Sequence, residues 1–303
     1  MSTITLKKGA PDEVPSSGPH RANWKSVASR RRTRRRGVGA IAATTWLSAI
    51  AIAAVAAPLL PLPDPAEITD QYSIPPFRDA AHLLGTDPLG RDLLSRAVFG
   101  AQISLAVAIG ATLLALTVGT ALGLAAGYFR RTVDVTFDIG TNTLLAFPPL
   151  ILLIALVAVL EPSITTLVIG LALVGMPTFA RIARANTIAF AGREFVTASK
   201  SLGASTFRVL VREILPNVAL PVLSFAIVVA ASLVVAEGSL SFLGLGVPPP
   251  TPSWGGMIAA GRESLYEDPY LVLVPGAFFF LTVLSLNITG DWARDRIGRE
   301  SSL

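Results

Sequence analysis

The chain has 303 residues, of which 52% are hydrophobic and 15% are charged, and its mean hydropathy is +0.61. A soluble domain usually carries about 25% charged residues, so this composition excludes an ordinary soluble protein. The chain has no cysteine, which excludes disulfides, cysteine-bound zinc and thiol nucleophiles. Its two histidines, His20 and His82, lie outside the apolar segments. We therefore do not expect an intramembrane serine–histidine pair or a multi-histidine metal site.

Six uncharged windows are long enough to cross a membrane. A transmembrane helix needs about 20 consecutive, mostly apolar residues, and a helix satisfies its own backbone hydrogen bonds, as hydrocarbon requires. We therefore predict an all-α polytopic membrane protein with six transmembrane helices. The windows are Gly37–Leu60, Ala97–Phe129, Ile139–Leu160, Pro162–Ala180, Ile214–Ala236 and Pro269–Gly290.

The lysines and arginines predict the orientation, because cytoplasmic loops of membrane proteins carry an excess of these residues. With a cytoplasmic N-terminus, the inner segments hold 21 of the 25 basic residues and the outer segments hold 4. We therefore expect both termini in the cytoplasm. The inner segments are then 1–36, 130–138, 181–213 and 291–303, and the outer segments are 61–96, 237–268 and a short turn at Glu161.

The beginning of the chain has two interpretations. Residues 29–36 place six arginines before an apolar run, which resembles a twin-arginine signal, and the alanine-rich residues 53–57 would suit a signal peptidase. The uncharged run of 24 residues is longer than a normal signal core. We therefore favour a retained first span over residues 37–60. The residues before it, 1–36, are expected to form a basic, largely disordered tail.

The first outer segment, residues 61–96, contains a predicted helix start. Asp87 is a good N-cap and Pro88 suits the first helical position. We therefore expect a short amphipathic helix that lies at the outer surface and leads into the second span. The segment either only caps and anchors this helix, or it presents a surface to a partner outside the membrane. In the second case, the candidate contact residues are Asp87, Arg91 and Asp92.

The second outer segment, residues 237–268, begins with an ionisable residue. Glu237 stands at the outer end of an uncharged span, where such a residue is a candidate for the substrate route. With Ser239 and Ser241 it forms our candidate pathway or gating set. The alternative is a glutamate that is simply exposed at the membrane interface. The same segment has aromatic residues of the kind found at membrane interfaces, namely Trp254, Tyr266 and Tyr270.

The loop over residues 181–213 has the pattern of two short helices joined at a glycine. Gly203 can end the first helix in a left-handed cap, and Ser205 can cap the second. A soluble partner could bind the first helix in a groove, or the helix could rest on anionic lipid, and periodicity favours neither. The first helix has its apolar and small residues at positions i, i+3, i+4 and i+7, namely Phe195, Ala198, Ser199 and Leu202.

This loop, within residues 194–216, resembles the EAA loop of ABC importer permeases. In that pattern, E-A-A is followed after three residues by glycine, then by nine residues and I-x-L-P. Gly203, Leu215 and Pro216 match in register. The segment Thr197-Ala198-Ser199 stands in place of E-A-A and keeps the first alanine, and Glu213 replaces the isoleucine.

Further motifs resemble one subfamily, the dipeptide, oligopeptide and nickel permeases, and within it the second of two paired permease subunits. The resemblance covers about residues 40–297. The motifs are Gly85-Thr-Asp-Pro-Leu-Gly-Arg-Asp92, Ser95-Arg96, Gly100, Ser104, Leu240-Ser-Phe-Leu-Gly-Leu-Gly246, Pro252-Ser-Trp-Gly255 and Gly290-Asp-Trp-Ala-Arg-Asp295.

The resemblance implies a type I ABC importer permease fold with its core over residues 97–290, in the cell membrane of a prokaryote. It implies a second, homologous permease that completes the pathway, one or two cytoplasmic ATPase subunits, and an extracytoplasmic binding protein that delivers di- or oligopeptides. No nucleic-acid partner is implied. The coupling helix of such permeases contacts the ATPase. That role is carried onto Thr197, Ala198, Ser199, Leu202 and Gly203.

The resemblance also implies a non-catalytic chain without a cofactor of its own, since ATP and Mg²⁺ are used by the ATPase subunits. The sequence agrees, because it has no glycine-rich phosphate loop of the G-x-x-x-x-G-K-[ST] type.

Other functions remain as alternatives. A secondary transporter driven by an ion gradient usually has ionisable residues within its spans or inverted repeats, and neither is evident here. An intramembrane enzyme would need a nucleophile or a paired-aspartate motif that the spans lack. A non-transporting membrane scaffold is compatible with the inner loop.

Overall fold

The computed structural model describes the backbone of residues 24–300 and the side chains of residues 38–296. The chain divides into two units, residues 1–38 and residues 39–303, and all side-chain contacts discussed below lie within the second. Of the tail expected over residues 1–36, residues 1–23 lie outside the described residues. The last three residues of the tail expected over 291–303 also lie outside them.

The described residues are helical apart from their connections and one isolated bridge between Thr86 and Asp92. This confirms the predicted all-α class. The α-helices are α1 (Trp24–Ala56), α2 (Leu93–Phe129), α3 (Arg131–Ala146), α4 (Pro149–Leu160), α5 (Ile164–Ala191), α6 (Glu194–Ser201), α7 (Thr206–Arg208), α8 (Leu215–Phe242), α9 (Trp254–Gly261) and α10 (Tyr270–Glu300). Short turns of other helical types cover Ala57–Leu59, Val209–Ile214 and Arg262–Ser264.

Five stretches in the described part of the chain are long and apolar enough to cross a membrane, and α3 and α4 together would make a sixth. The predicted number of six spans therefore holds if the bent pair crosses once. Several boundaries differ from the prediction: α2 begins at Leu93 rather than at Ala97, α5 ends at Ala191 rather than at Ala180, and α8 ends at Phe242 rather than at Ala236. Helix α1 begins at Trp24 rather than at Gly37, and α10 continues beyond Gly290 to Glu300. Hydropathy marks the part of a helix that suits hydrocarbon, whereas the helix itself continues into polar sequence.

The third predicted span, Ile139–Leu160, is broken in the structure. Helices α3 and α4 meet at an angle of 88°, at the sequence Phe147-Pro148-Pro149. Phe147 is extended, as expected for a residue before proline. Two consecutive prolines remove two backbone donors and end a helix, so the bend follows from the local sequence.

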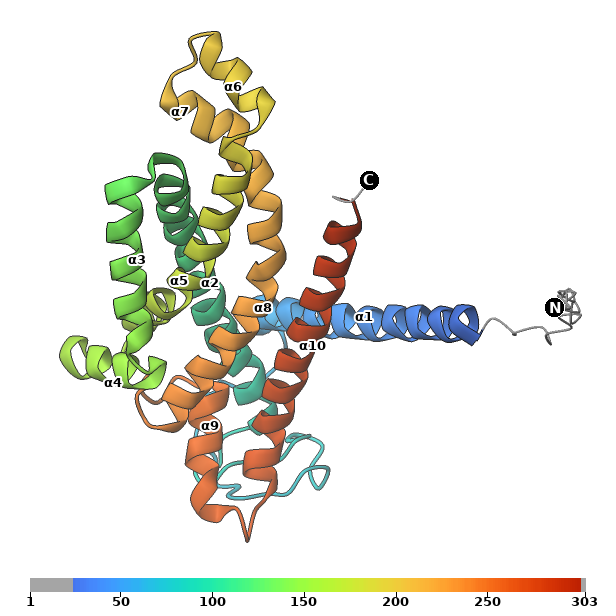
Figure 1. Ribbon diagram of the computed structural model, residues 1–303. Helices are drawn as coiled ribbons and strands as arrows, with labels where there is room; N and C mark the ends of the chain where they lie inside the picture. Colours follow the sequence, from blue (N-terminus) through green and yellow to red (C-terminus); the bar gives the residue numbers. More distant parts are fainter. Residues whose placement is uncertain (1–23, 301–303) are drawn as a thin grey trace, which may run out of the picture. The chain divides into compact units, whose positions relative to one another are not determined.

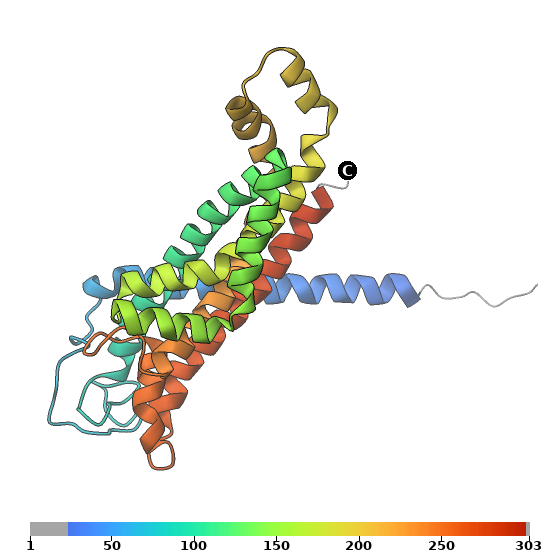
Figure 2. The same cartoon turned by 60° about the vertical axis from the view of Figure 1, so that its left-hand side comes forward.

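Within residues 39–303, helices α2, α5 and α8 pack together and share one apolar core. Figures 1 and 2 show that α6 and α7 lie at one end of this group, and that α9 and the connection before α2 lie at the opposite end. Helix α10 runs from the α9 end towards the α6 end. The two regions that the sequence marks as functional therefore lie at opposite ends of the same helices.

Helices α2 and α5 are held in direct backbone contact by three glycines of α2, spaced four residues apart. A Cβ atom on Gly123 would lie 2.3 Å from the carbonyl oxygen of Ala180, and one on Gly127 would lie 2.7 Å from the Cβ of Thr187. A Cβ on Gly119 would meet the carbonyl oxygen of Met176 at 2.7 Å. Small residues at this spacing allow close helix packing inside a membrane. Any side chain at these positions would therefore push the helices apart.

We predict that Gly123→Ala lowers the stability of the chain by about 1–3 kcal/mol, because overpacking a close contact forces the backbone to shift. The matched control is Gly276→Ala in α10, where an added Cβ would meet no atom within 4 Å. Thermal unfolding of the detergent-purified variants checks this. Equal unfolding midpoints for the two variants would contradict the close α2–α5 contact.

Candidate functional site

The predicted pattern of helix, glycine bend and helix is present in the loop between α5 and α8. Helix α6 ends at Ser201, and Gly203 has a φ of +83°, which lies in the left-handed region. The N–H of Ala204 donates to the carbonyl of Ser199 at 3.1 Å, and so closes the helix end. Ser205 caps α7 through the N–H of Arg208, as predicted.

The apolar face predicted for α6 is exposed. Leu202 is 89% exposed and Phe207, at the start of α7, is 75% exposed. Thr197 and Ala198 are also exposed, and Ser199 is half-buried. Large apolar side chains in such positions mark interaction surfaces. We define the coupling surface as Thr197, Ala198, Ser199, Leu202, Gly203 and Phe207.

The opposite side of α6 is anchored to the core. Val196 is fully buried and belongs to the same apolar cluster as Val209 and Ile214, which precede α8. The ammonium group of Lys200 lies 4.7 Å from the centre of the Tyr128 ring, at the end of α2, which is a favourable cation–π distance. Helix α6 is therefore attached to the ends of the long helices while its other face stays free.

A charged cluster joins α3 to α5 at the same end. The guanidinium of Arg184 donates to both carboxylate oxygens of Asp134, with an Nη2–Oδ2 distance of 2.8 Å, and it lies 3.5 Å from Asp138. Arg181 donates to Asn142 at 2.9 Å. The bidentate geometry fixes orientation as well as distance. The two aspartates of α3 thus bind α5 directly.

At the opposite end, the predicted amphipathic helix at Asp87 is absent, and the helix begins later, at Leu93. Asp92 caps α2 by accepting the N–H of Ser95 at 2.7 Å, and its other oxygen lies 3.0 Å from Nδ1 of His82. Asp87 instead closes a turn by accepting the N–H groups of Leu89 and Arg91. The helix cap is therefore Asp92, which accepts the N–H of Ser95, and not Asp87.

The three outer candidates differ in exposure. Asp87 and Asp92 are buried, and Arg91 is half-buried. The carboxylate of Asp87 accepts Nε of Arg91 at 2.7 Å and lies 3.7 Å from Nε of Arg96. The carboxylates of the two aspartates therefore already have partners within the chain. The guanidinium groups beside them are the groups left to bind a partner.

The three residues of the pathway set differ in how far they are buried. Glu237 is 0% exposed, and Ser241 donates to its Oε1 at 2.7 Å. Its Oε2 has no hydrogen-bond partner among the described residues. Ser239 is half-buried and lines an apolar cavity of about 370 Å³ with Val235, Leu243 and Phe279. The structure thus brings Glu237 and Ser241 together inside the chain, and Ser239 alone reaches the cavity.

Trp254 differs from the interfacial position expected for it. It is fully buried, and its Nε1–H donates to the carbonyl of Ala97 in α2 at 2.9 Å. A tryptophan can be buried when its N–H finds such a partner. Tyr266, in contrast, is fully exposed.

Several residues of these sites escaped the sequence analysis. Arg184 and Tyr128 gave no local signal, because their partners come from distant elements. The glycines of α2 did give one, since their four-residue spacing is visible in the sequence. No group of three or more His, Asp or Glu side chains that could hold a metal occurs within the described part of the chain.

Comparison with known proteins gives a consistent result. The family described as binding-protein-dependent transport system inner membrane component matches residues 119–301, more than half of the chain. The di/tripeptide transport system permease protein DppC of Pseudomonas aeruginosa is 35% identical over 95% of both chains. The glutathione transport system permease protein GsiD of Pectobacterium atrosepticum is 37% identical over 88% of both chains.

Among solved structures, the MetNI methionine ABC transporter in an inward-facing conformation has a similar fold. The TM-score is 0.55 at 16% sequence identity, and the match covers 68% of this chain and 97% of the other. This likeness supports the ABC importer permease fold expected from the sequence.

Members of the matched family are multi-pass permeases of the inner membrane. They bind no cofactor and are not enzymes, since the ATP is used by partner ATPase subunits, and they depend on a binding protein. By the family match and by its near full-length relatives, this chain belongs to the binding-protein-dependent transport system inner membrane components and is a permease of an ABC importer.

Proposed function

We propose that this permease forms the transmembrane pathway for small peptides, di- or tripeptides or glutathione, together with a second, homologous permease. The observation that carries the proposal is the similarity over 95% of both chains to a di/tripeptide permease. The cavity beside Ser239, with its apolar walls, suits peptides that carry apolar side chains. In this proposal Ser239 lines the pathway. Glu237 and Ser241 lie buried within the chain and stabilise the helix that carries Ser239.

We infer that both termini lie in the cytoplasm. The segments 130–138 and 181–213, which together hold eight basic residues, lie at the α6 end of the long helices (Figure 1). The more acidic connection before α2 lies at the other end. Because basic residues gather on the cytoplasmic side of a membrane, the α6 end faces the ATPase and the α9 end faces the binding protein.

The coupling surface is the contact to the ATPase. Leu202 and Phe207 are exposed enough to enter an apolar cleft of a partner, and the small residues Ala198 and Ser199 allow close approach. Gly203 sets the angle between the two short helices. A helix-in-groove contact of this kind transmits a displacement of the ATPase to the permease.

The displacement reaches the membrane through α2 and α5. Val196 and Lys200 attach α6 to the core and to Tyr128 of α2, and the glycine contact makes α2 and α5 move together. The ion pair of Arg184 with Asp134 then extends the moving body to α3. In this proposal, α3 and its bent continuation α4 follow the ATPase.

The second permease covers apolar surface that this chain leaves open. Helices α3 and α4 expose large apolar side chains on several sides, among them Val135, Ile139 and Ile151. Lipid can cover part of this surface. A paired subunit is the partner that a pathway between two chains requires.

The function is tested by transport. We expect the purified complex, reconstituted in liposomes with its binding protein, to take up labelled dialanine when ATP is supplied. A non-hydrolysable ATP analogue should stop the uptake. Uptake that persists with the analogue and collapses with a proton ionophore would contradict the proposal and favour a secondary transporter.

Gly203→Val should uncouple transport from ATP hydrolysis. A β-branched residue at a positive φ is strained, and left-handed backbone costs an L-residue about 1–2 kcal/mol, so the bend would change. Gly203→Asn is the matched control, since asparagine tolerates this conformation. Uptake and binding-protein-stimulated ATPase activity are measured for both variants. Normal coupling in the valine variant would refute the role of the bend.

Arg184→Asp should reduce the amount of uptake per ATP hydrolysed, because it places like charges between α3 and α5. The double variant Arg184→Asp with Asp134→Arg restores opposite charges and should recover most of the coupling. The readout is the ratio of peptide imported to phosphate released. If the double variant is no better than the single one, the ion pair does not carry motion to α3.

A further inference from the structure

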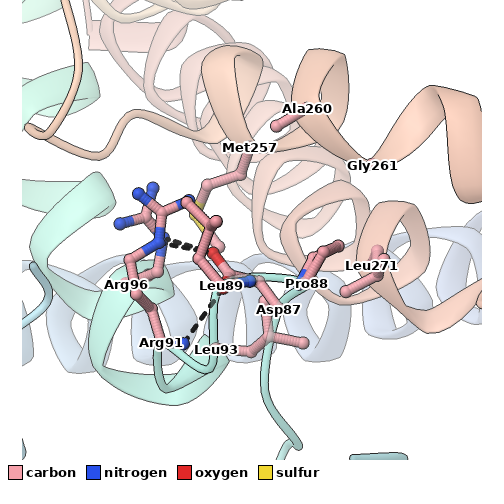
Figure 3. Close-up of a pocket in the computed structure, with 10 residues that line it drawn as sticks. All are labelled: Asp87, Pro88, Leu89, Arg91, Leu93, Arg96, Met257, Ala260, Gly261 and Leu271. Carbon is pink, nitrogen blue, oxygen red and sulfur yellow. Dashed lines mark hydrogen bonds and ion pairs between the residues drawn. The ribbon is translucent and has the colours of Figure 1, made fainter. Parts of the chain in front are cut away.

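A small pocket lies at the end of the molecule opposite α6, and it is lined on one side by charge. It has a volume of about 200 Å³, and its polar wall consists of Asp87, Arg91 and Arg96 (Figure 3). The facing wall is apolar and comes from α9 and the start of α10, with Met257 and Leu271. Sites for whole small molecules usually have about 300–1,000 Å³. The pocket therefore suits a single side chain rather than a free peptide.

The polar wall of the pocket has more positive than negative groups. Two guanidinium groups face one carboxylate, that of Asp87, which already accepts hydrogen bonds from the backbone N–H groups of Leu89 and Arg91. Arg96 is 7% exposed and donates Nη1 to the carbonyl of Pro65 at 2.7 Å. One positive charge thus remains without a carboxylate within the described residues of the pocket. Arginine binds carboxylates in a planar, bidentate geometry.

We propose that this pocket binds a carboxylate side chain, Asp or Glu, of the extracytoplasmic binding protein. The inference rests on the proposed function for the orientation and for the presence of that partner. The aliphatic stem of the partner's side chain packs against Met257 and Leu271, and its carboxylate lies against Arg91 and Arg96. The exposed side chains of Pro88 and Leu89 form an apolar rim, which excludes water from such a contact.

The surrounding charge favours a protein carboxylate over an anionic membrane surface. Residues 61–96 contain six acidic and three basic residues, so the segment as a whole repels an extended negative surface. A single carboxylate is attracted only at the pocket. Such local complementarity fixes the register of two partners and suppresses wrong orientations. The pocket therefore determines how the binding protein is placed on the permease.

The sharpest test fills the pocket from within the chain. Ala260 of α9 lines the pocket and is exposed, and its side chain makes no bond that a substitution would break. Ala260→Glu supplies a competing carboxylate, and Ala260→Gln has nearly the same size without the charge. With the whole transporter in phosphatidylcholine nanodiscs, we expect Ala260→Glu to weaken the affinity for the purified binding protein about tenfold relative to Ala260→Gln. Equal affinities of the two variants would overturn the proposal.

A second series removes the charge itself. Arg91→Gln should weaken the same affinity about tenfold, and Arg91→Lys should weaken it less because it keeps the charge. Arg78→Gln, an exposed arginine of the same segment, is the control and should leave the affinity unchanged. An equal loss in Arg78→Gln and Arg91→Gln would contradict a specific pocket. Thermal unfolding identifies variants that lose affinity because they unfold. If the Arg91 variants unfold, the comparison of Ala260→Glu with Ala260→Gln decides whether the pocket binds a carboxylate.

Two further readouts separate the possible failures. If Ala260→Glu changes only the phosphatidylglycerol retained in mixed-lipid nanodiscs and not the binding-protein affinity, the pocket is a lipid site and the proposal is wrong. Binding is measured without transport. A wild-type complex that binds the protein through this pocket but imports no peptide would therefore overturn the proposed substrate and leave the pocket assignment standing.

Discussion

Gly119, Gly123 and Gly127 let the backbones of α2 and α5 touch over about two helical turns, and this contact fixes the relative positions of the two helices that connect both ends of the molecule. At one end it holds the base of α6, through Val196 and Tyr128. At the other end, α2 begins directly after its cap Asp92, beside the pocket lined by Arg91 and Arg96. Because the two helices cannot separate without exposing backbone, they form a rigid connection between the α6 end and the α9 end of the long helices.

The two surfaces would bind their partner proteins through different kinds of interaction. The coupling surface offers exposed apolar side chains on a protruding loop, with Leu202 at its tip, and its affinity depends on how well a partner's groove covers them. The outer pocket is recessed and charged, and it recognises one functional group. In the proposed function, the partner at the coupling surface hydrolyses ATP and must stay attached through a cycle, which favours burial of apolar area. The partner proposed for the pocket delivers substrate and must arrive in one orientation and leave, which favours a localised charge contact.

The sequence analysis predicted what depends on local composition. The long apolar stretches and the bend at Gly203 are each encoded within a few neighbouring residues. It failed where the outcome depends on distant partners. Asp87, which is followed by proline, was the expected cap, and only the structure shows that the N–H of Ser95 donates to Asp92 instead. Trp254 was expected at a membrane interface, and Glu237 either on the substrate route or exposed at the interface. The packing of α2, α8 and α9 shows that both are buried.

The bend between α3 and α4 has a consequence for how this part of the chain meets the membrane. Pro148 and Pro149 have no N–H to offer, so the carbonyl oxygens of Leu144 and Leu145 receive no donor from the next helical turn. Hydrocarbon does not tolerate bare carbonyl groups, and such backbone occurs at membrane depth only against protein or a water-filled cavity. The bend must therefore turn away from lipid. Its two oxygens are backbone acceptors that can bind polar groups on the protein-covered or water-filled side of the bend without any charged side chain.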